Sequence, residues 1–170
     1  IMSTTWTNYM HYRKELYAPL VSSSLPNSLI SEANWIVRGR CRSGEDLGIR
    51  LKPGDICYLD YGQAYLNEAG YQHFGLVITV YSHKALVVPM TSNKAQYASA
   101  YDEKENPRGK RHLMRIGALP GMAKPSVLFL NDMKFINTAR VIDVKAHMDE
   151  NSVLFLRVKS RLLRIISGMV

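Results

Sequence analysis

Glu68, His73 and Thr91 are the side chains whose types and spacing could support proton transfer. Glu68 and His73 lie in and just after a polar loop, and Thr91 ends the apolar run that follows, directly before Ser92 and Asn93. A histidine can accept or donate a proton near neutral pH. If the apolar runs on either side of residue 82 pair as strands, these side chains converge. We therefore predict a proton-transfer site within residues 51–93.

Each of these residues also has an ordinary structural alternative. Thr91 at a strand end could simply cap the following backbone with its hydroxyl. A single histidine is commonly a surface or core residue, and Glu68 could be a solvated loop charge. The types and spacing alone leave both interpretations open.

The elements that must position these residues follow from the hydrophobic pattern. Apolar residues recur at helical spacing over residues 5–21 and from residue 28 onward, and again over 149–166, where acidic residues come first and basic residues last. We expect Trp6 and Trp35 to pack the first two helices, and Val158, Leu162, Ile165 and Ile166 to face the core. Runs typical of strands cover 56–60, 73–81, 85–91, 113–116, 126–130 and 132–142.

The connections between these strands are short, apart from an excursion over residues 92–111 for which we predict no element. The pattern predicts an α+β protein with an antiparallel sheet. We predict two parts: a helical N-terminal extension over residues 1–50 and a barrel domain over 51–170.

Composition and charge restrict the functional class. The chain has 170 residues, a formal charge of +8 and a pI near 9.6, which favours a polyanionic partner, either nucleic acid or an acidic protein. No apolar run approaches the roughly 20 residues that span a bilayer, so we expect a cytoplasmic protein without membrane contact. Cys41 and Cys57 lack ligand spacing, and we predict no disulfide, no metal site and no cofactor.

The order of the motifs resembles the MazF/PemK family of toxin ribonucleases. The residues that carry the resemblance are Pro53-Gly54-Asp55-Ile56, Tyr58-Leu59-Asp60, Asn67-Glu68-Ala69-Gly70, Leu76-Val77-Ile78, Val87-Val88-Pro89-Met90-Thr91-Ser92-Asn93 and the run from Ser126 to Ile136. The similarity spans about residues 51–168 and leaves the first fifty residues outside.

The resemblance implies a small SH3-like barrel of the CcdB/MazF type, a homodimer and an antitoxin partner. It also implies cleavage of single-stranded RNA without a metal, by attack of the 2′-hydroxyl on its own phosphate to leave a 2′,3′-cyclic end. This reaction needs a proton acceptor at the 2′-oxygen, a donor at the leaving 5′-oxygen and positive charge near the non-bridging oxygens.

Carried over by position, the family's catalytic threonine falls on Thr91. Its catalytic arginine has no counterpart, because Gln72-His73-Phe74 stands where an Arg-Pro pair is usual. We predict that His73 substitutes for the arginine, with Glu68 handling or orienting a proton. Arg115, together with His112, could supply the missing positive group; the alternative for Arg115 is an ordinary charge paired with a carboxylate.

The remaining predicted contacts concern RNA binding. Lys94, Lys110 and Arg111 would form an electrostatic track for the RNA backbone. Ser92 and Asn93 would assist Thr91. Gln72 is either a turn residue or a contact to a base, and Tyr71 and Tyr65 could stack on bases or simply pack.

The sequence leaves two alternatives open, one for the function and one for the kind of antitoxin. The same barrel could be a non-enzymatic binder, either an RNA-binding module or a protein-directed toxin such as a gyrase poison. The string from Pro89 to Lys94 also looks like the threonine-serine-lysine turn of toxins whose antitoxin is an RNA, so the antitoxin could be RNA or protein.

Overall fold

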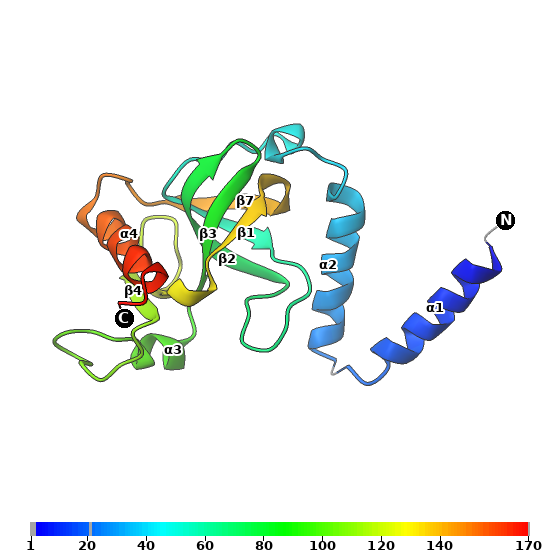
Figure 1. Cartoon of the computed structure of the whole chain (residues 1–170), viewed down its shortest axis with the longest axis horizontal. Coiled ribbons are helices and arrows are strands. Elements are labelled where there is room, and N and C mark those ends of the chain that lie inside the picture. The colour runs from blue at the N-terminus through cyan, green and yellow to red at the C-terminus, as the bar shows by residue number, and fades with distance from the viewer. Residues whose placement is uncertain (1–2, 21, 170) are drawn as a thin grey trace.

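The computed structural model describes residues 3–20 and 22–169, and within them seven strands form one antiparallel sheet. The strand order is β4-β5-β3-β2-β1-β7, and β6 pairs with the other part of β3. The predicted α+β class is confirmed (Figure 1). The strands are β1 (Asp55–Asp60), β2 (Gln72–Tyr81), β3 (Lys84–Thr91), β4 (Leu113–Gly117), β5 (Ser126–Phe129), β6 (Lys134–Asn137) and β7 (Val141–His147).

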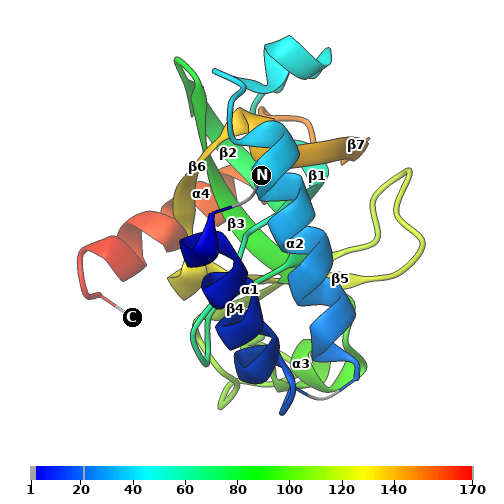
Figure 2. The same cartoon turned by 90° about the vertical axis from the view of Figure 1, so that its right-hand side faces the viewer.

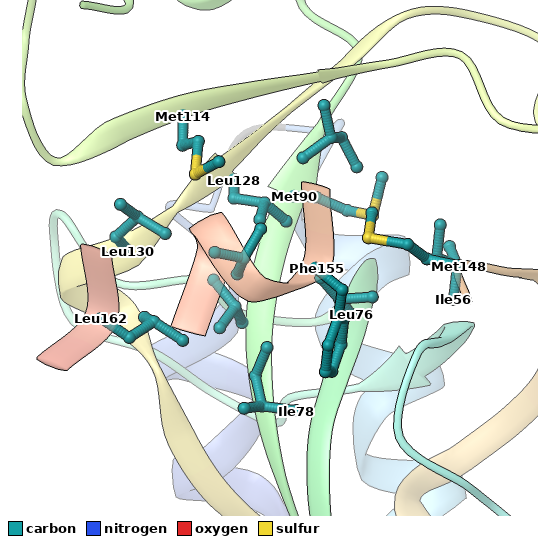
Figure 3. Close-up of a cluster of buried hydrophobic side chains, with 13 residues drawn as sticks. Ile56, Leu76, Ile78, Met90, Met114, Leu128, Leu130, Met148, Phe155 and Leu162 are labelled. Atoms are coloured by element: carbon teal, nitrogen blue, oxygen red, sulfur yellow. The ribbon is translucent and has the colours of Figure 1, made fainter. Parts of the chain in front are cut away.

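The C-terminal helix α4 (Val153–Ile166) covers one face of the sheet. Phe155, Val158 and Leu162 are fully or nearly fully buried against strand residues such as Leu76 and Leu128 (Figure 3). Ser152 caps the helix by accepting a hydrogen bond from the Phe155 N–H at 3.1 Å. The helix therefore begins at residue 153 and not at 149.

The predicted apolar stripe of α4 is wrong at one position, because Ile166 is 65% exposed. A second core cluster lies among residues of β1, β2, β3 and β7 and includes Cys57, which has no exposed surface. Burial, together with the charges of Asp55 and Asp143, raises the pKa of the Cys57 thiol to about 12. Cys57 is therefore an inert core thiol.

Helices α1 (Thr4–Tyr17) and α2 (Ser24–Arg38) precede the sheet; α2 runs beside it, and α1 lies on the far side of α2 (Figure 1). The expected packing role of their tryptophans is wrong: Trp6 is 44% and Trp35 71% exposed. None of the described residues of α1 is buried. An ion pair between Arg13 and Glu32 joins the two helices.

Helix α2 docks on the sheet through its polar side. Its buried residues are Ser28 and Ser31, whereas the apolar residues Ile36 and Val37 are 60% and 74% exposed. The cause is a buried carboxylate on the sheet, described below, which attracts hydrogen-bond donors rather than apolar groups.

The excursion over residues 92–111 contains structure that we did not predict. Asn93 caps a short helix, α3 (Lys94–Ser99), by accepting hydrogen bonds from the N–H groups of Ala95 and Gln96. Two isolated β-bridges follow, Ala100 with Lys110 and Asp102 with Asn106. In the described ranges no helix is long and apolar enough to cross a membrane.

Candidate active site

The ends of β2 and β3 bring His73 and Thr91 together. The register pairs Phe74 with Met90 and Gly75 with Pro89. His73 and Thr91 are the next residues outward along the two strands, so they are neighbours across the pair. Because side chains alternate along a strand, both lie on the face opposite to Phe74 and Met90.

The imidazole of His73 has a defined orientation. Its Nδ1 lies 2.5 Å from the carbonyl oxygen of Gly70. A carbonyl oxygen only accepts hydrogen bonds, so Nδ1 must carry the proton. In a neutral ring the lone pair then belongs to Nε2, which is the nitrogen that can accept a proton from a substrate.

The hydroxyl of Thr91 accepts a hydrogen bond within the protein but does not donate one to a described residue. Its oxygen accepts a hydrogen bond from the Asn93 N–H at 3.2 Å, as the capping alternative requires. The hydroxyl proton has no partner among the described residues and can be donated to an anion. Both interpretations of Thr91 are therefore compatible with this geometry.

Glu68 and Gln72 make local contacts instead of meeting Thr91. The Glu68 carboxylate is exposed and accepts a hydrogen bond from the Tyr65 N–H within the loop at 3.3 Å. The Gln72 amide donates to Asp60 at 2.8 Å and to the Asn27 carbonyl oxygen at 3.4 Å. Gln72 thus links the loop to α2, although it directly precedes His73.

The guanidinium of Arg115 is occupied by contacts to α3 and to Glu105. It donates to the Tyr97 carbonyl oxygen at 2.9 Å, pairs with Glu105 at 2.5 Å and lies 4.9 Å above the Tyr97 ring. Burial, followed by the charge of Lys110, lowers the pKa of His112, which favours its neutral form. The catalytic role of Arg115 stays a prediction, and the structure gives this residue a second role in fixing α3.

The predicted RNA contacts are spread over the surface around α3 and the loop. Ser92, Lys94, Lys110 and Arg111 are exposed, and Arg111 lies 4.6 Å above the ring of Tyr101. Asn93 is also exposed, with its side chain occupied as the α3 cap. Tyr71 has a φ of 55° and is fixed by backbone hydrogen bonds to Tyr61 and Gly62, both at 2.7 Å.

A cleft of about 340 Å³ borders the candidate site and contains residues that the sequence did not single out. Thr91 and Ser92 line it together with Phe74, Lys124 and Lys145, whereas His73, on the opposite face, is not among its lining residues. Phe74 is 40% exposed, so its ring is available to a base; Lys124 provides positive charge, and Lys145 is paired with Asp143. Only the tertiary structure joins these segments, so sequence spacing offers no signal for them.

The buried carboxylate of Asp60 holds the loop that leads to His73 in place. Asp60 is 4% exposed and accepts hydrogen bonds from Ser31 at 2.7 Å, Asn34 at 2.6 Å, and Gln72 and the Gly62 N–H, both at 2.8 Å. Burial by itself raises the pKa of Asp60, but these four donors outweigh it and hold the pKa below its ordinary value. Asp60 therefore stays ionised and joins α2 to the loop that leads to His73.

No group of three or more His, Cys, Asp or Glu side chains within residues 3–20 and 22–169 is arranged to hold a metal ion. The chemistry available to the described side chains is proton transfer by His73, hydrogen bonding by Thr91 and attraction of anions by the lysines.

Comparison with solved structures identifies the fold of this chain. MazF from Deinococcus radiodurans superposes with a TM-score of 0.50 at 13% identity, over 71% of this chain and 99% of that one. This chain has a MazF-like fold. The predicted resemblance is thereby confirmed at the level of the fold, since the identity is too low to carry residue roles.

Two further solved structures match less closely. A MazE-MazF complex from Deinococcus radiodurans has a TM-score of 0.46 at 15% identity, over 71% of this chain and 97% of that one. A mycobacterial endoribonuclease in complex with its cognate antitoxin has a TM-score of 0.46 at 9% identity, over 71% and 98%. No family model and no curated protein matches the chain.

Proposed function

We propose that this protein is a toxin-type endoribonuclease that cleaves single-stranded RNA without a metal ion. The observation that supports this most is the neighbouring position of His73 and Thr91 at the ends of β2 and β3 within a MazF-like fold. A histidine with a free Nε2 beside a hydroxyl with a free proton is a pair suited to proton transfer at a phosphate.

In the proposed reaction, Nε2 of neutral His73 takes the proton of the 2′-hydroxyl. The 2′-oxygen then forms a bond to the adjacent phosphorus, and the bond from phosphorus to the 5′-oxygen breaks. The leaving 5′-oxygen takes a proton from a water molecule, and protonated His73 gives its proton to the hydroxide that remains, so the products are a 2′,3′-cyclic phosphate and a 5′-hydroxyl. Thr91 donates a hydrogen bond to a non-bridging oxygen, where negative charge develops.

In this proposal Arg115 supplies positive charge at the phosphate, because the register places it on the same face as Thr91 through Val127, whereas the cleft with Phe74 and Met90 lies on the opposite face. Arg115 would first have to leave its pair with Glu105, and Lys145 in the cleft is likewise paired, with Asp143. Lys94, Lys110 and Arg111 would guide the RNA backbone, as their exposure allows. Glu68 would act by orienting the loop, since its carboxylate bonds to that loop.

The proposal includes a cytoplasmic homodimer and a cognate antitoxin, either protein or RNA. The antitoxin-bound mycobacterial endoribonuclease and the MazE-MazF complex are the neighbours that motivate it. The charge of +8 suits an acidic protein or an RNA equally.

The test is incubation of the purified protein with a mixed RNA pool in excess EDTA. We expect fragments that end in a 2′,3′-cyclic phosphate and begin with a 5′-hydroxyl. Intact RNA at high protein concentration would overturn the proposal, as would cleavage that EDTA abolishes. Protein carrying Thr91→Ala, prepared in parallel, excludes a contaminating nuclease.

A non-enzymatic binder on the same fold is the second candidate, and one observation favours it. Arg115 is the arginine that the register places on the face of Thr91, and it is paired with Glu105, so the cation that the family resemblance implies is occupied. In that case RNA should bind without being cut. Recovery of a topoisomerase subunit in place of RNA from a pull-down would indicate a protein-directed toxin.

A further inference from the structure

A second, larger cavity lies between the N-terminal helices and the sheet. It has a volume of about 630 Å³ and is lined by α1, α2, the turn after β1 and the segment between β6 and β7. We call it the N-terminal groove. Figures 1 and 2 show α1 and α2 on the side of the sheet away from α4. The groove is thus separate from the cleft beside Thr91.

Aromatic rings in this groove are exposed instead of packed. Tyr9, Tyr12 and Trp35 line it with exposed fractions of 52%, 59% and 71%. Large aromatic rings gain most from burial, so three exposed rings around one cavity need a reason other than helix packing. Flat rings at the wall of an open groove are suited to stack on flat ligand groups.

The groove also holds arginines that have donors to spare. Arg38 donates to the carbonyl oxygens of Ala139 at 3.3 Å and Val141 at 2.8 Å, and Arg140 donates to the Asp60 carbonyl oxygen at 3.2 Å. Within the described ranges neither guanidinium has a carboxylate within 4.0 Å, and each retains further N–H groups.

The two carboxylates of the groove are already satisfied. Glu32 pairs with Arg13, and Asp60 accepts four hydrogen bonds. The positive charge of Arg38 and Arg140 is therefore available to an anionic ligand. Rings that stack and guanidinium groups that bind anions are the combination by which proteins hold single-stranded nucleic acid.

The groove continues towards the candidate active site. Gly62 and Gln63 line it and begin the loop whose last residue is Tyr71. The Tyr71 N–H donates to the Gly62 carbonyl oxygen at 2.7 Å, so the two ends of the loop meet. His73 follows two residues later. An RNA strand held at His73 could extend into the groove without leaving the protein surface.

We propose that the N-terminal groove binds a single-stranded segment of the RNA substrate outside the scissile position, with Tyr12 and Trp35 stacking on bases and Arg38 and Arg140 holding phosphates. This rests on the proposed function for the identity of the substrate. An acidic peptide would use the arginines but would leave the exposed rings without a role, and the continuity with the loop favours RNA.

Fluorescence anisotropy of labelled oligouridylates tests this, with all proteins carrying Thr91→Ala to prevent cleavage. The probes are about 4 and about 16 nucleotides long, which spans the site sizes known for small barrels. We expect Trp35→Ala and Tyr12→Ala each to weaken binding of the long probe by roughly 5- to 100-fold, the effect of losing one base stack. The short probe, which can occupy the cleft beside Thr91 alone, should lose less.

Tyr81→Ala is the matched control, because Tyr81 is 80% exposed and lies at the other end of β2. It should bind both probes like the parent. Equal binding of the long probe by the Trp35, Tyr12 and Tyr81 variants would overturn the proposal. The proposal would also be overturned if binding of an oligoglutamate peptide depended on Trp35 and binding of the long RNA did not.

Alkylation of Cys41 gives a second, independent measurement. Cys41 lines the groove, whereas Cys57 is buried with a pKa of about 12 and stays unreactive. The long probe should slow alkylation of Cys41 by iodoacetamide, and an unchanged rate at saturating RNA would contradict the proposal. Neither measurement involves cleavage. RNA can therefore bind in the groove even if the RNA-pool test shows no cleavage, and RNA can be cleaved even if the groove does not bind it.

Discussion

At the scale of single residues, the account depends on how His73 and Thr91 are oriented. The Gly70 carbonyl oxygen fixes the His73 tautomer, and the Asn93 N–H fixes the Thr91 hydroxyl oxygen. Each group thus has one atom bound to the protein and one atom available. Fixed partners of this kind prepare a site for a transition state without reorganisation.

His73→Gln and Thr91→Ala should each lower the rate of RNA cleavage by roughly 100-fold or more, the usual contribution of a proton-transfer or charge-stabilising group. Single-turnover cleavage of a labelled RNA measures this. His83→Gln serves as the control, since His83 is exposed in the turn between β2 and β3, at the far end of the same strand pair. Parental rates in the His73 and Thr91 variants would show that other residues carry the reaction.

At the scale of elements, the sheet and its helices are held by two different kinds of contact. Helix α4 packs through apolar side chains, whereas α2 packs through hydrogen bonds to the Asp60 carboxylate. The first interaction is insensitive to pH, and the second requires that Asp60 be ionised. The two helices should therefore respond differently to mutation and to acid.

Asp60→Asn should lower the free energy of unfolding by about 1–3 kcal/mol at neutral pH, because buried donors lose their acceptor. The folded-state pKa of Asp60 lies below the ordinary 3.8. Its stabilisation is therefore complete above pH 3.8 and is lost as the pH falls through the folded-state value. The difference in unfolding free energy between parent and variant should shrink below pH 3.8; a difference independent of pH would contradict this role.

Phe155→Ala should destabilise the protein by about 3–5 kcal/mol, because Phe155 is 1% exposed and its removal leaves a cavity under α4. Ile166→Ala removes an apolar side chain from the same helix at a position that is 65% exposed, and should stay within about 0.5 kcal/mol of the parent. Urea unfolding of both variants provides the comparison. Similar losses in the two would mean that α4 packs differently.

At the scale of the whole molecule, the sequence predicted the elements better than their contacts. The strand run over residues 85–91 and the helical spacing of apolar residues in α4 are local patterns, and the structure confirms both elements. The polar docking of α2 was missed because apolar residues were expected to face inwards. Nothing local shows that Asp60 would be buried and would attract Ser31 and Asn34.

Part of the candidate site was also predictable from the sequence. The resemblance makes Thr91 a candidate, and the register of β2 and β3 makes His73 its neighbour. The cleft with Phe74, Lys124 and Lys145 joins three distant segments, so only tertiary structure could show it. Helix α3 was a different kind of miss, because Asn93 before Lys94-Ala95-Gln96 is a recognisable capping signal.

The central claim is that RNA supplies its own nucleophile beside His73 and Thr91. Once a cleavage position has been mapped in the RNA pool, two oligonucleotides that differ only in a single 2′-deoxy substitution at the scissile nucleotide test it in EDTA. The all-ribose oligonucleotide should be cut to a cyclic phosphate, and the substituted one should remain intact. Cleavage of the substituted oligonucleotide at the same position would contradict it.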